Sequence, residues 1–199
     1  MSKTFGFQSG IELETLLYSV ELTDNIGKEI ILELSSNINN CQSNRKRAEE
    51  CQDPMFFTDS NGLHMQKRVL NSKYGKNFSN PIEIGYNYYP VTSAISIEDK
   101  ITANRITILN DRAQGGSSQR EGKIELMLQR TPLKDDNKGL DEDCVEVDLH
   151  TGNPTNLTLK HRIYLSNGAG IYLFYKKKNY PKFIEKYVRN SASAEDDTE

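Results

Sequence analysis

The sequence predicts an all-β protein, a β-sandwich of mostly antiparallel strands with a short helix near the C-terminus. Short runs rich in Val, Ile, Thr, Tyr and Phe recur along the chain, and several alternate apolar with polar side chains. Clusters of Gly, Asn, Asp, Ser and Pro separate these runs and supply the turns. Many short strands with such punctuation are typical of sandwiches.

Length, composition and charge restrict the class of protein. A chain of 199 residues suits one domain with a substantial core. The net charge of −3 argues against a general nucleic-acid binder, because such proteins carry a strong basic excess. No apolar run approaches the ~20 residues that cross a bilayer, and residues 1–10 lack the apolar segment of a secretory signal. We therefore expect no nucleic-acid and no membrane partner, and a chain that is cytosolic or part of something longer.

The strand pattern divides the chain into three parts. Residues 1–10 are expected to form an irregular lead-in, and residues 11–178 hold the β-sandwich. Residues 179–199 are expected to form a short helix and a disordered acidic tail. The helix is predicted at residues 181–189, with Pro181 in its first turn.

The N-terminal part predicts a hairpin followed by an insertion. Residues 11–22 have apolar side chains at alternate and adjacent positions, so periodicity leaves helix and strand open. The turn sequence Asp-Asn-Ile-Gly follows, and residues 28–34 are typical of a partner strand. Residues 35–54 are long for a connection in a compact domain and predict an exposed insertion.

The central part predicts a second hairpin and three further strands. Its arms are residues 55–58 and 63–70, and Asn61-Gly62 is the dipeptide that favours a tight hairpin turn. Residues 72–84 are expected to form a loop. Residues 86–97 favour a strand, and Pro90 within them predicts a sheet edge or a bulge at that end. The further strands are expected at residues 86–97, 105–109 and 123–129.

The last third repeats the strand-and-turn pattern. Alternating apolar side chains predict a strand at residues 145–149, and the sequence Thr-Gly-Asn-Pro predicts a turn. Two more strands are expected at residues 157–165 and 171–175. The lysine run at residues 176–178 is more consistent with a solvated strand end than with nucleic-acid contact, given the acidic total.

Cys41 and Cys51 bracket a polar loop inside the insertion. A disulfide between them would imply an oxidising compartment, but two free thiols in an exposed loop explain the sequence equally well. Cys144 is left over. Zinc bound by cysteine is disfavoured because no CxxC sequence occurs. The histidines show no ligand spacing either; they are His64, His150 and His161.

Four sequence blocks carry a resemblance to a known family. They are FFTDSNGLHMQKR, NYYPVTSAISIED, ITILNDRAQGGSSQREGKIELMLQR and DDNKGL, beginning at Phe56, Asn87, Ile106 and Asp135. Their order and gaps resemble the C-terminal β-domain of family 38 glycoside hydrolases, the class II α-mannosidases. The QGGSS and TDSNGL forms are more similar to the lysosomal type than to the Golgi type, and the likeness extends over residues 11–175.

The resemblance implies a segment of a retaining α-mannosidase that removes terminal mannose from N-linked glycans with two carboxylates. In that family a zinc ion, held by two Asp and two His, binds the sugar hydroxyls, and these ligands lie upstream of the matched region. No counterpart of the family's HxDxGW or HHDA-type sequences occurs here. We therefore expect no catalytic residue and no cofactor in this chain, and zinc in the whole enzyme. The implied partners are the N-terminal catalytic domain of the same enzyme and mannose-containing glycans, in the lysosome or secretory pathway.

The resemblance points to one candidate substrate-binding turn. Its residues are Asp135, Asp136, Asn137 and Lys138, which match a family turn that reaches toward the active-site cleft. Carboxylates and an amide suit sugar hydroxyls, which both donate and accept hydrogen bonds. The family usually carries Arg in place of Lys138, and a lysine offers a point charge instead of a planar fork of donors. The alternative is that DDNKG only caps a turn through Asx-type bonds.

Other polar and aromatic residues have structural as well as functional interpretations. The Asn-Gly hairpin explains Asp59 and its neighbours without a ligand. Residues 111–114 predict either a buried polar network or a surface turn. The three tyrosines in residues 86–89 suit stacking on a sugar ring, although packing in an edge strand is the commoner role.

Three functions stay open at this level. The chain is a non-catalytic segment of an α-mannosidase, a stand-alone carbohydrate-binding or interaction β-module, or a structural remnant with an incomplete core. Upstream coding sequence with HxDxGW indicates the first, and mannoside binding by the isolated chain favours the second. Broad, non-cooperative melting is the expected sign of the third.

Overall fold

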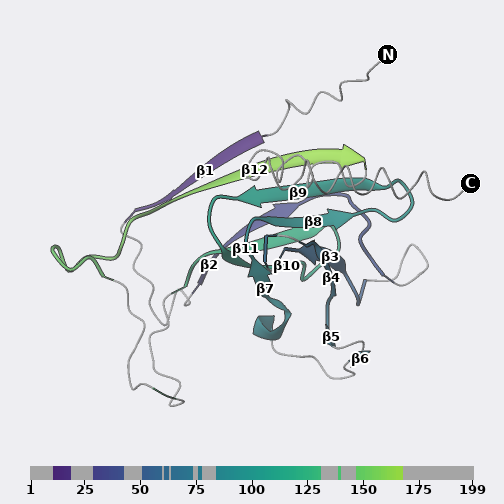
Figure 1. The fold of residues 1–199 in the computed structure, drawn as a ribbon, viewed down its shortest axis with the longest axis horizontal. Coiled ribbons are helices and arrows are strands. Elements are labelled where there is room, and N and C mark those ends of the chain that lie inside the picture. Colours follow the sequence, from purple (N-terminus) through teal and green to yellow (C-terminus); the bar gives the residue numbers. More distant parts are fainter. Residues whose placement is uncertain are drawn as a thin grey trace, which may run out of the picture.

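The protein folds as a β-sandwich of two antiparallel sheets, shown by a computed structural model in Figure 1. The structure describes residues 11–18, 29–42, 51–59, 61–62, 64–73, 76–77, 84–130, 139 and 147–167. This architecture confirms the predicted fold class. The strand expected at 171–175 and the helix expected at 181–189 lie outside the described residues. Within the described part, no helix combines the length and the apolar character needed to cross a membrane.

The larger sheet has eight strands and the smaller sheet has four. In spatial order the larger sheet contains β1 (Ile11–Leu17), β12 (Leu157–Asn167), β9 (Asn104–Asn110), β8 (Ala94–Glu98), β3 (Met55–Thr58), β4 (Gln66–Val69), β5 (Ser72–Lys73) and β6 (Lys76–Asn77). The smaller sheet contains β2 (Glu29–Ser35), β11 (Lys123–Arg130), β10 (Gln114–Ser117) and β7 (Tyr89–Val91). A short 3-10 helix, η1 (Ile84–Asn87), precedes β7.

The main core lies between the two sheets. Side chains from β3, β8 and β9 of the larger sheet meet side chains from β7 and β11 of the smaller one. The cluster consists of Ile38, Phe56, Val91, Ile95, Ile97, Ile106, Ile108, Ile124 and Leu126. Because full burial of such a side chain contributes about 1.5–3 kcal/mol, this cluster is the main force that joins the sheets.

The predicted N-terminal hairpin is wrong. β1 pairs with β12 in the larger sheet, whereas β2 pairs with β11 in the smaller sheet. Both segments are strands as their β-branched content allowed, but sequence neighbours do not have to pair when a chain crosses between two sheets. The residues around the crossover in the insertion are also less exposed than expected, since Ile38, Asn40 and Cys41 are buried.

The second hairpin is confirmed, with a longer turn than predicted. β3 and β4 are antiparallel, and β4 begins at Gln66, so the Asn-Gly pair sits inside a wider connection. Gly62 has the expected positive φ of 68°. The backbone N–H of His64 donates to Asn61 Oδ1 at 3.1 Å. The stretch 72–84, predicted as a loop, instead contains the short paired strands β5 and β6.

The strand-forming run at residues 86–97 divides between the two sheets. It forms the end of η1, then β7 at the edge of the smaller sheet, then β8 inside the larger one. Pro90 lies in β7, so the predicted position at a sheet edge is confirmed, because an edge strand tolerates a missing N–H. The strands predicted at 105–109 and 123–129 are confirmed as β9 and β11.

The strand predicted at residues 145–149 is not present in the described residues of that stretch. Val147 makes only an isolated bridge to Pro154, and Leu149 is 95% exposed. Asp148 instead caps a turn, because its Oδ1 accepts the N–H groups of His150 and Thr151, each at 2.9 Å. These hydrogen bonds also lower the pKa of Asp148, that from Thr151 most strongly. The strand predicted at 157–165 is confirmed as β12.

Candidate functional site

The candidate substrate-binding turn, Asp135 to Lys138, lies outside the described residues. Its two described neighbours are the end of β11 at Arg130 and Gly139, which has a φ of 155°. β11 is an interior strand of the smaller sheet, paired on both sides by β2 and β10. The role of the turn in sugar binding stays a prediction.

Asp59 of the TDSNG block follows β3 directly and binds the backbone where β8 begins, at Ser93 and Ala94. It is fully buried, and its Oδ1 accepts the backbone N–H groups of Ser93 and Ala94 at 2.9 and 2.8 Å. The Ser93 hydroxyl donates to the other carboxylate oxygen. The structural interpretation of Asp59 is therefore confirmed, and the bonds reach further along the chain than a hairpin turn requires.

The QGGSS block contains β10, and Gly116 in this strand packs closely against side chains of the main core. A Cβ added to Gly116 would lie 2.6 Å from Val91 Cγ2 and 3.0 Å from Ile95 Cδ1. Ser117 is fully buried and its hydroxyl donates to the carbonyl of Asn87 at 2.8 Å. The block thus brings β10 close to β7 and β8 and leaves no space for a ligand at Gly116.

Residues 111–114 contain both of the predicted arrangements. Asp111 and Arg112 are exposed, and the Arg112 guanidinium donates to the carbonyl of Thr158 at 2.8 Å. Gln114 instead lies inside: its amide nitrogen donates to the carbonyl of Met127 at 3.0 Å, and its Oε1 is 2.8 Å from His161 Nε2. Here the Gln114 oxygen accepts and His161 Nε2 carries the proton.

His161 joins the two sheets through this contact. It belongs to β12 of the larger sheet and is fully buried, whereas Gln114 belongs to β10 of the smaller sheet. Its other ring nitrogen, Nδ1, has no hydrogen-bond partner. Burial lowers the pKa of His161, and the nearby Asp111 carboxylate partly opposes that shift. The imidazole is therefore held neutral, and its contact with Gln114 links the two sheets.

The tyrosines near β7 have protein partners. The Tyr88 hydroxyl donates to Glu125 Oε2 at 2.6 Å, and burial together with that carboxylate raises the Tyr88 pKa. Tyr89 packs edge-on against Phe56, with ring centroids 5.9 Å apart, and the Arg68 guanidinium lies 4.3 Å from the Tyr89 ring centre. Tyr86 is 56% exposed. The contacts of Tyr88 and Tyr89 support the packing interpretation over sugar stacking.

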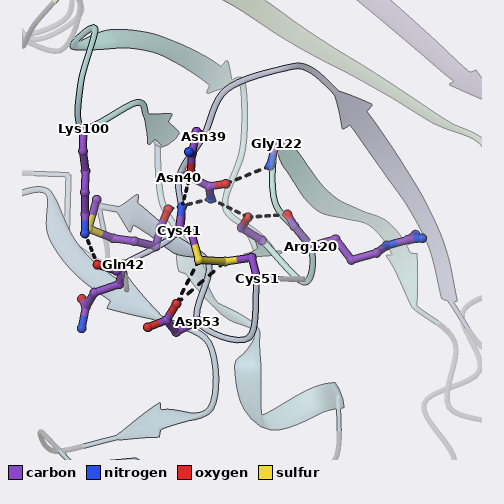
Figure 2. The surroundings of a disulfide bond; sticks show 11 residues. Asn39, Asn40, Cys41, Gln42, Cys51, Asp53, Lys100, Arg120 and Gly122 are labelled. Carbon is purple, nitrogen blue, oxygen red and sulfur yellow. Dashed lines mark hydrogen bonds between the residues drawn. A yellow bond between two sulfur atoms is a disulfide. The ribbon is translucent and has the colours of Figure 1, made fainter. Parts of the chain in front are cut away.

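Figure 2 shows the disulfide between Cys41 and Cys51, with a Cα–Cα distance of 5.7 Å. The disulfide alternative is thus the one that the structure supports; Cys144 lies outside the described residues. Beside it, the fully buried Asn40 donates from Nδ2 to the carbonyl of Met55 at 2.8 Å and to Ser118 Oγ at 3.1 Å. Its Oδ1 accepts the N–H of Gly122 at 2.8 Å. Asn40 therefore fastens the start of the insertion to both sheets.

The described residues do not supply the zinc site that the resemblance implies for the whole enzyme. The histidine in the core, His161, faces Gln114, and His64 and His150 are exposed. Within the described part of the chain, one group of three metal-ligand side chains converges, and it consists of Cys41, Cys51 and Asp53. That group contains no histidine, so it does not fit a site of two Asp and two His.

The sequence matches the family model of the glycosyl hydrolases family 38 C-terminal domain over residues 5–138. The chain belongs to this family. Its relatives include a probable α-mannosidase of Arabidopsis thaliana, 29% identical over 82% of this chain and 15% of the relative. The lysosomal α-mannosidase of Bos taurus is 36% identical over 68% of the chain and 12% of the relative. The lysosomal α-mannosidase of Homo sapiens is 33% identical over 70% of the chain and 12% of the relative.

The chain thus spans only 12–15% of the length of these curated relatives.

Three described residues that make buried hydrogen bonds were given no role in the sequence-based prediction: Asn40, Ser93 and His161. Asn40 and His161 carry little local signal, because Gly122, which donates to Asn40, and Gln114, which contacts His161, lie 82 and 47 residues away in the chain. A polar side chain within an apolar alternation, as at His161 between Leu159 and Ile163, is the signal that indicates a buried hydrogen bond.

Proposed function

We propose that this chain is a non-catalytic β-domain segment of an α-mannosidase, in which another part of the enzyme performs the retaining hydrolysis of terminal α-mannose from N-linked glycans. The observation that carries the proposal is the family 38 C-terminal domain match over residues 5–138. The named relatives, of which this chain covers 12–15%, are α-mannosidases, which supports an activity of the whole enzyme rather than of this segment.

The buried polar residues of the described part support a scaffold role. Asp59 and Glu125 are the carboxylates buried within it, and each is occupied, Asp59 by backbone N–H groups and Glu125 by the Tyr88 hydroxyl. A retaining glycosidase needs two carboxyl groups about 5–5.5 Å apart and free to reach the sugar. In this proposal the carboxylates of the catalytic domain fill that role, and a zinc ion held there binds the sugar hydroxyls.

The contribution of this segment to the substrate is assigned to its acidic turn. We expect Asp135, Asp136 and Asn137 to accept and donate hydrogen bonds with sugar hydroxyls, and Lys138 to donate to them. The lysosomal relatives support a location in the lysosome or the secretory pathway, and the Cys41–Cys51 disulfide is consistent with it.

A lysine substitution in the whole enzyme tests the substrate role of the turn. We expect Lys138→Ala to lower kcat/KM for an aryl α-mannoside at least tenfold, about 1.4 kcal/mol of transition-state stabilisation, with an unchanged melting temperature. Lys138→Arg should retain most activity, because the family usually carries Arg there. Lys67→Ala on the exposed face of β4 is the control and should leave kcat/KM unchanged. Equal loss of activity and of stability in Lys138→Ala would instead support the turn-cap alternative.

Assays of the isolated chain test whether catalysis belongs to another part of the enzyme. We expect it to show no zinc-dependent hydrolysis of an aryl α-mannoside, and to bind a separately produced family 38 catalytic domain. Turnover that a chelator abolishes would contradict the proposal. Mannoside binding by the isolated chain, without any affinity for the catalytic domain, would favour a stand-alone carbohydrate-binding module.

A further inference from the structure

The sequence Asn156-Leu157-Thr158 has the form of an N-glycosylation acceptor, Asn-X-Thr with X other than Pro. It lies where the chain enters β12, the strand that pairs with the edge strand β1 (Figure 1). Such triplets also arise by chance, so a glycan is expected only where the folded chain leaves room for it. No part of the proposed function uses these residues.

Asn156 and Thr158 are exposed, on the side of the chain that faces away from the space between the sheets. Leu157, which lies between them, packs against a hydrophobic cluster that includes Leu159 and Leu17. Leu17 is also the residue of β1 that pairs with Leu157. Because side chains alternate across a strand, the triplet presents its Asn and its Thr to water and its Leu to the core. A bulky, polar glycan on the Asn requires this orientation.

Two apolar side chains at the end of β1 are exposed beside this triplet. Leu16 pairs with Thr158 and is 63% exposed, and Tyr18, two residues further along, is 71% exposed. A residue two positions along a partner strand lies about 7–8 Å away, so a sugar on Asn156 reaches Leu16. Exposed apolar side chains on an edge strand favour association with other chains. A sugar over them would remove that liability.

We propose that Asn156 carries an N-linked glycan and that its first N-acetylglucosamine covers Leu16 and Tyr18. A transferase joins the Asn156 amide nitrogen to the anomeric carbon of this sugar. The bond from that carbon to the diphosphate of a lipid-linked oligosaccharide donor breaks, the diphosphate leaves with the electron pair, and the amide nitrogen loses one proton to a base. The proposal rests on the lysosomal or secretory location proposed above and is independent of any role in mannose hydrolysis.

The chain contains a matched control for the modification. Asn153 is exposed and is also followed by a threonine two residues later, but Pro154 between them excludes it as an acceptor. The full chain is produced in eukaryotic cells behind a cleavable secretion signal, so the result does not depend on its natural location or on the activity of the whole enzyme. An amidase that removes N-glycans converts each modified Asn to Asp. Peptide mass spectrometry of the secreted and the cell-retained chain should find this conversion at Asn156 and not at Asn153.

Substitutions identify the residues that the modification requires. Asn156→Gln and Thr158→Ala should each abolish the glycan, whereas Thr158→Ser should retain it, because the acceptor sequence needs a hydroxyl at that position. Asn153→Gln should leave the glycan in place. An unmodified Asn156 in both the secreted and the retained chain would show that the proposal is wrong.

Two ways of trimming the glycan test whether its first sugar covers the apolar side chains. The fluorescence of a dye that binds exposed apolar surface should increase when the amidase removes the whole glycan. It should stay low when an endoglycosidase leaves only the first N-acetylglucosamine. Leu16→Ser combined with Tyr18→Ser should abolish the increase. Equal fluorescence of the parent chain with and without the first sugar would contradict the proposed cover.

Discussion

At the scale of single residues, polar side chains of the family blocks, of the insertion and of β12 act mainly through buried hydrogen bonds. Asp59 fixes the corner at Ser93, Asn40 fastens the insertion, and Gln114 meets His161 between the sheets. Each of these side chains satisfies backbone or side-chain groups that would otherwise be buried without a partner, which costs about 1–3 kcal/mol per group. These residues therefore specify how the sheets meet rather than what the domain binds.

Gly116 provides the sharpest test of the packing. We expect Gly116→Ala to lower the free energy of unfolding by about 1–3 kcal/mol, because overpacking forces neighbours off their preferred rotamers and the new Cβ would approach Val91 Cγ2 to 2.6 Å. Gly115→Ala is the matched control, since its nearest neighbour would be Tyr88 Cδ1 at 3.6 Å. Urea unfolding measures both changes, and equal stabilities of the two variants would contradict the close fit.

His161 should make the fold sensitive to acid. Burial lowers its pKa below the ordinary 6.5, so the unfolded chain takes up a proton at a pH where the folded chain does not. Stability attributable to His161 is therefore complete above about pH 6.5 and falls as the pH decreases below it. Urea unfolding of the parent and of His161→Gln from pH 7.5 to 5 measures the difference. The parent should lose more stability over this range, and identical pH dependence in the two proteins would contradict the prediction.

At the scale of elements, complementary charges match the register of β1 and β12, a strand pair whose members lie far apart in the sequence. β1 and β12 place Glu12 opposite Arg162 and Glu14 opposite Lys160. Arg162 Nε donates to Glu12 Oε2 at 3.0 Å, and Lys160 Nζ lies 3.7 Å from Glu14 Oε1. A shift of one residue would turn the inward row of β1, including the buried Leu17, toward the opposite face. Burial therefore selects the face, and charge favours this register among those that keep the face.

A charge exchange across β1 and β12 measures the second effect. Glu12→Lys places like charges opposite each other and should destabilise the fold by about 0.5 kcal/mol, because exposed pairs contribute roughly 0.2–1 kcal/mol. Adding Arg162→Glu should restore most of the loss. A double-mutant cycle from urea unfolding at low and high salt gives the coupling energy, which should shrink as salt increases. A coupling of zero at low salt would mean that burial alone fixes the register.

At the scale of the whole molecule, the insertion is one of the connections through which the chain passes from the smaller sheet to the larger sheet. β2 lies in the smaller sheet and β3 in the larger sheet, and the Cys41–Cys51 bond closes the connection between them. Ser36 and Ile38 on the β2 side pack close to Gly122, where φ is 72° and an added Cβ would lie 2.3 Å from the Ser36 carbonyl oxygen. The crossover is thus joined to the sandwich by packing, by Asn40 and by the disulfide.

Removing the disulfide should destabilise the whole sandwich without changing its secondary structure. Cys41→Ser combined with Cys51→Ser is expected to lower the free energy of unfolding by about 2–3 kcal/mol, the chain-entropy value for a closed loop of this size, given a sequence separation of 10. Circular dichroism measures the secondary structure, and urea unfolding measures the free energy of unfolding. Cys144→Ser serves as the control for loss of a cysteine, and a change below about 0.5 kcal/mol in the double variant would contradict the expectation.

The sequence by itself determined the fold class, most strands and the family. Alternation and β-branched residues located β3, β9, β11 and β12, and Pro90 indicated an edge, because side-chain period and backbone restriction are local properties. Only the tertiary structure decided that β1 pairs with β12 instead of β2, that residues 86–97 divide between two sheets, and that His161 meets Gln114. These outcomes depend on contacts between distant parts of the chain, where the burial of whole faces outweighs any preference readable from neighbouring residues.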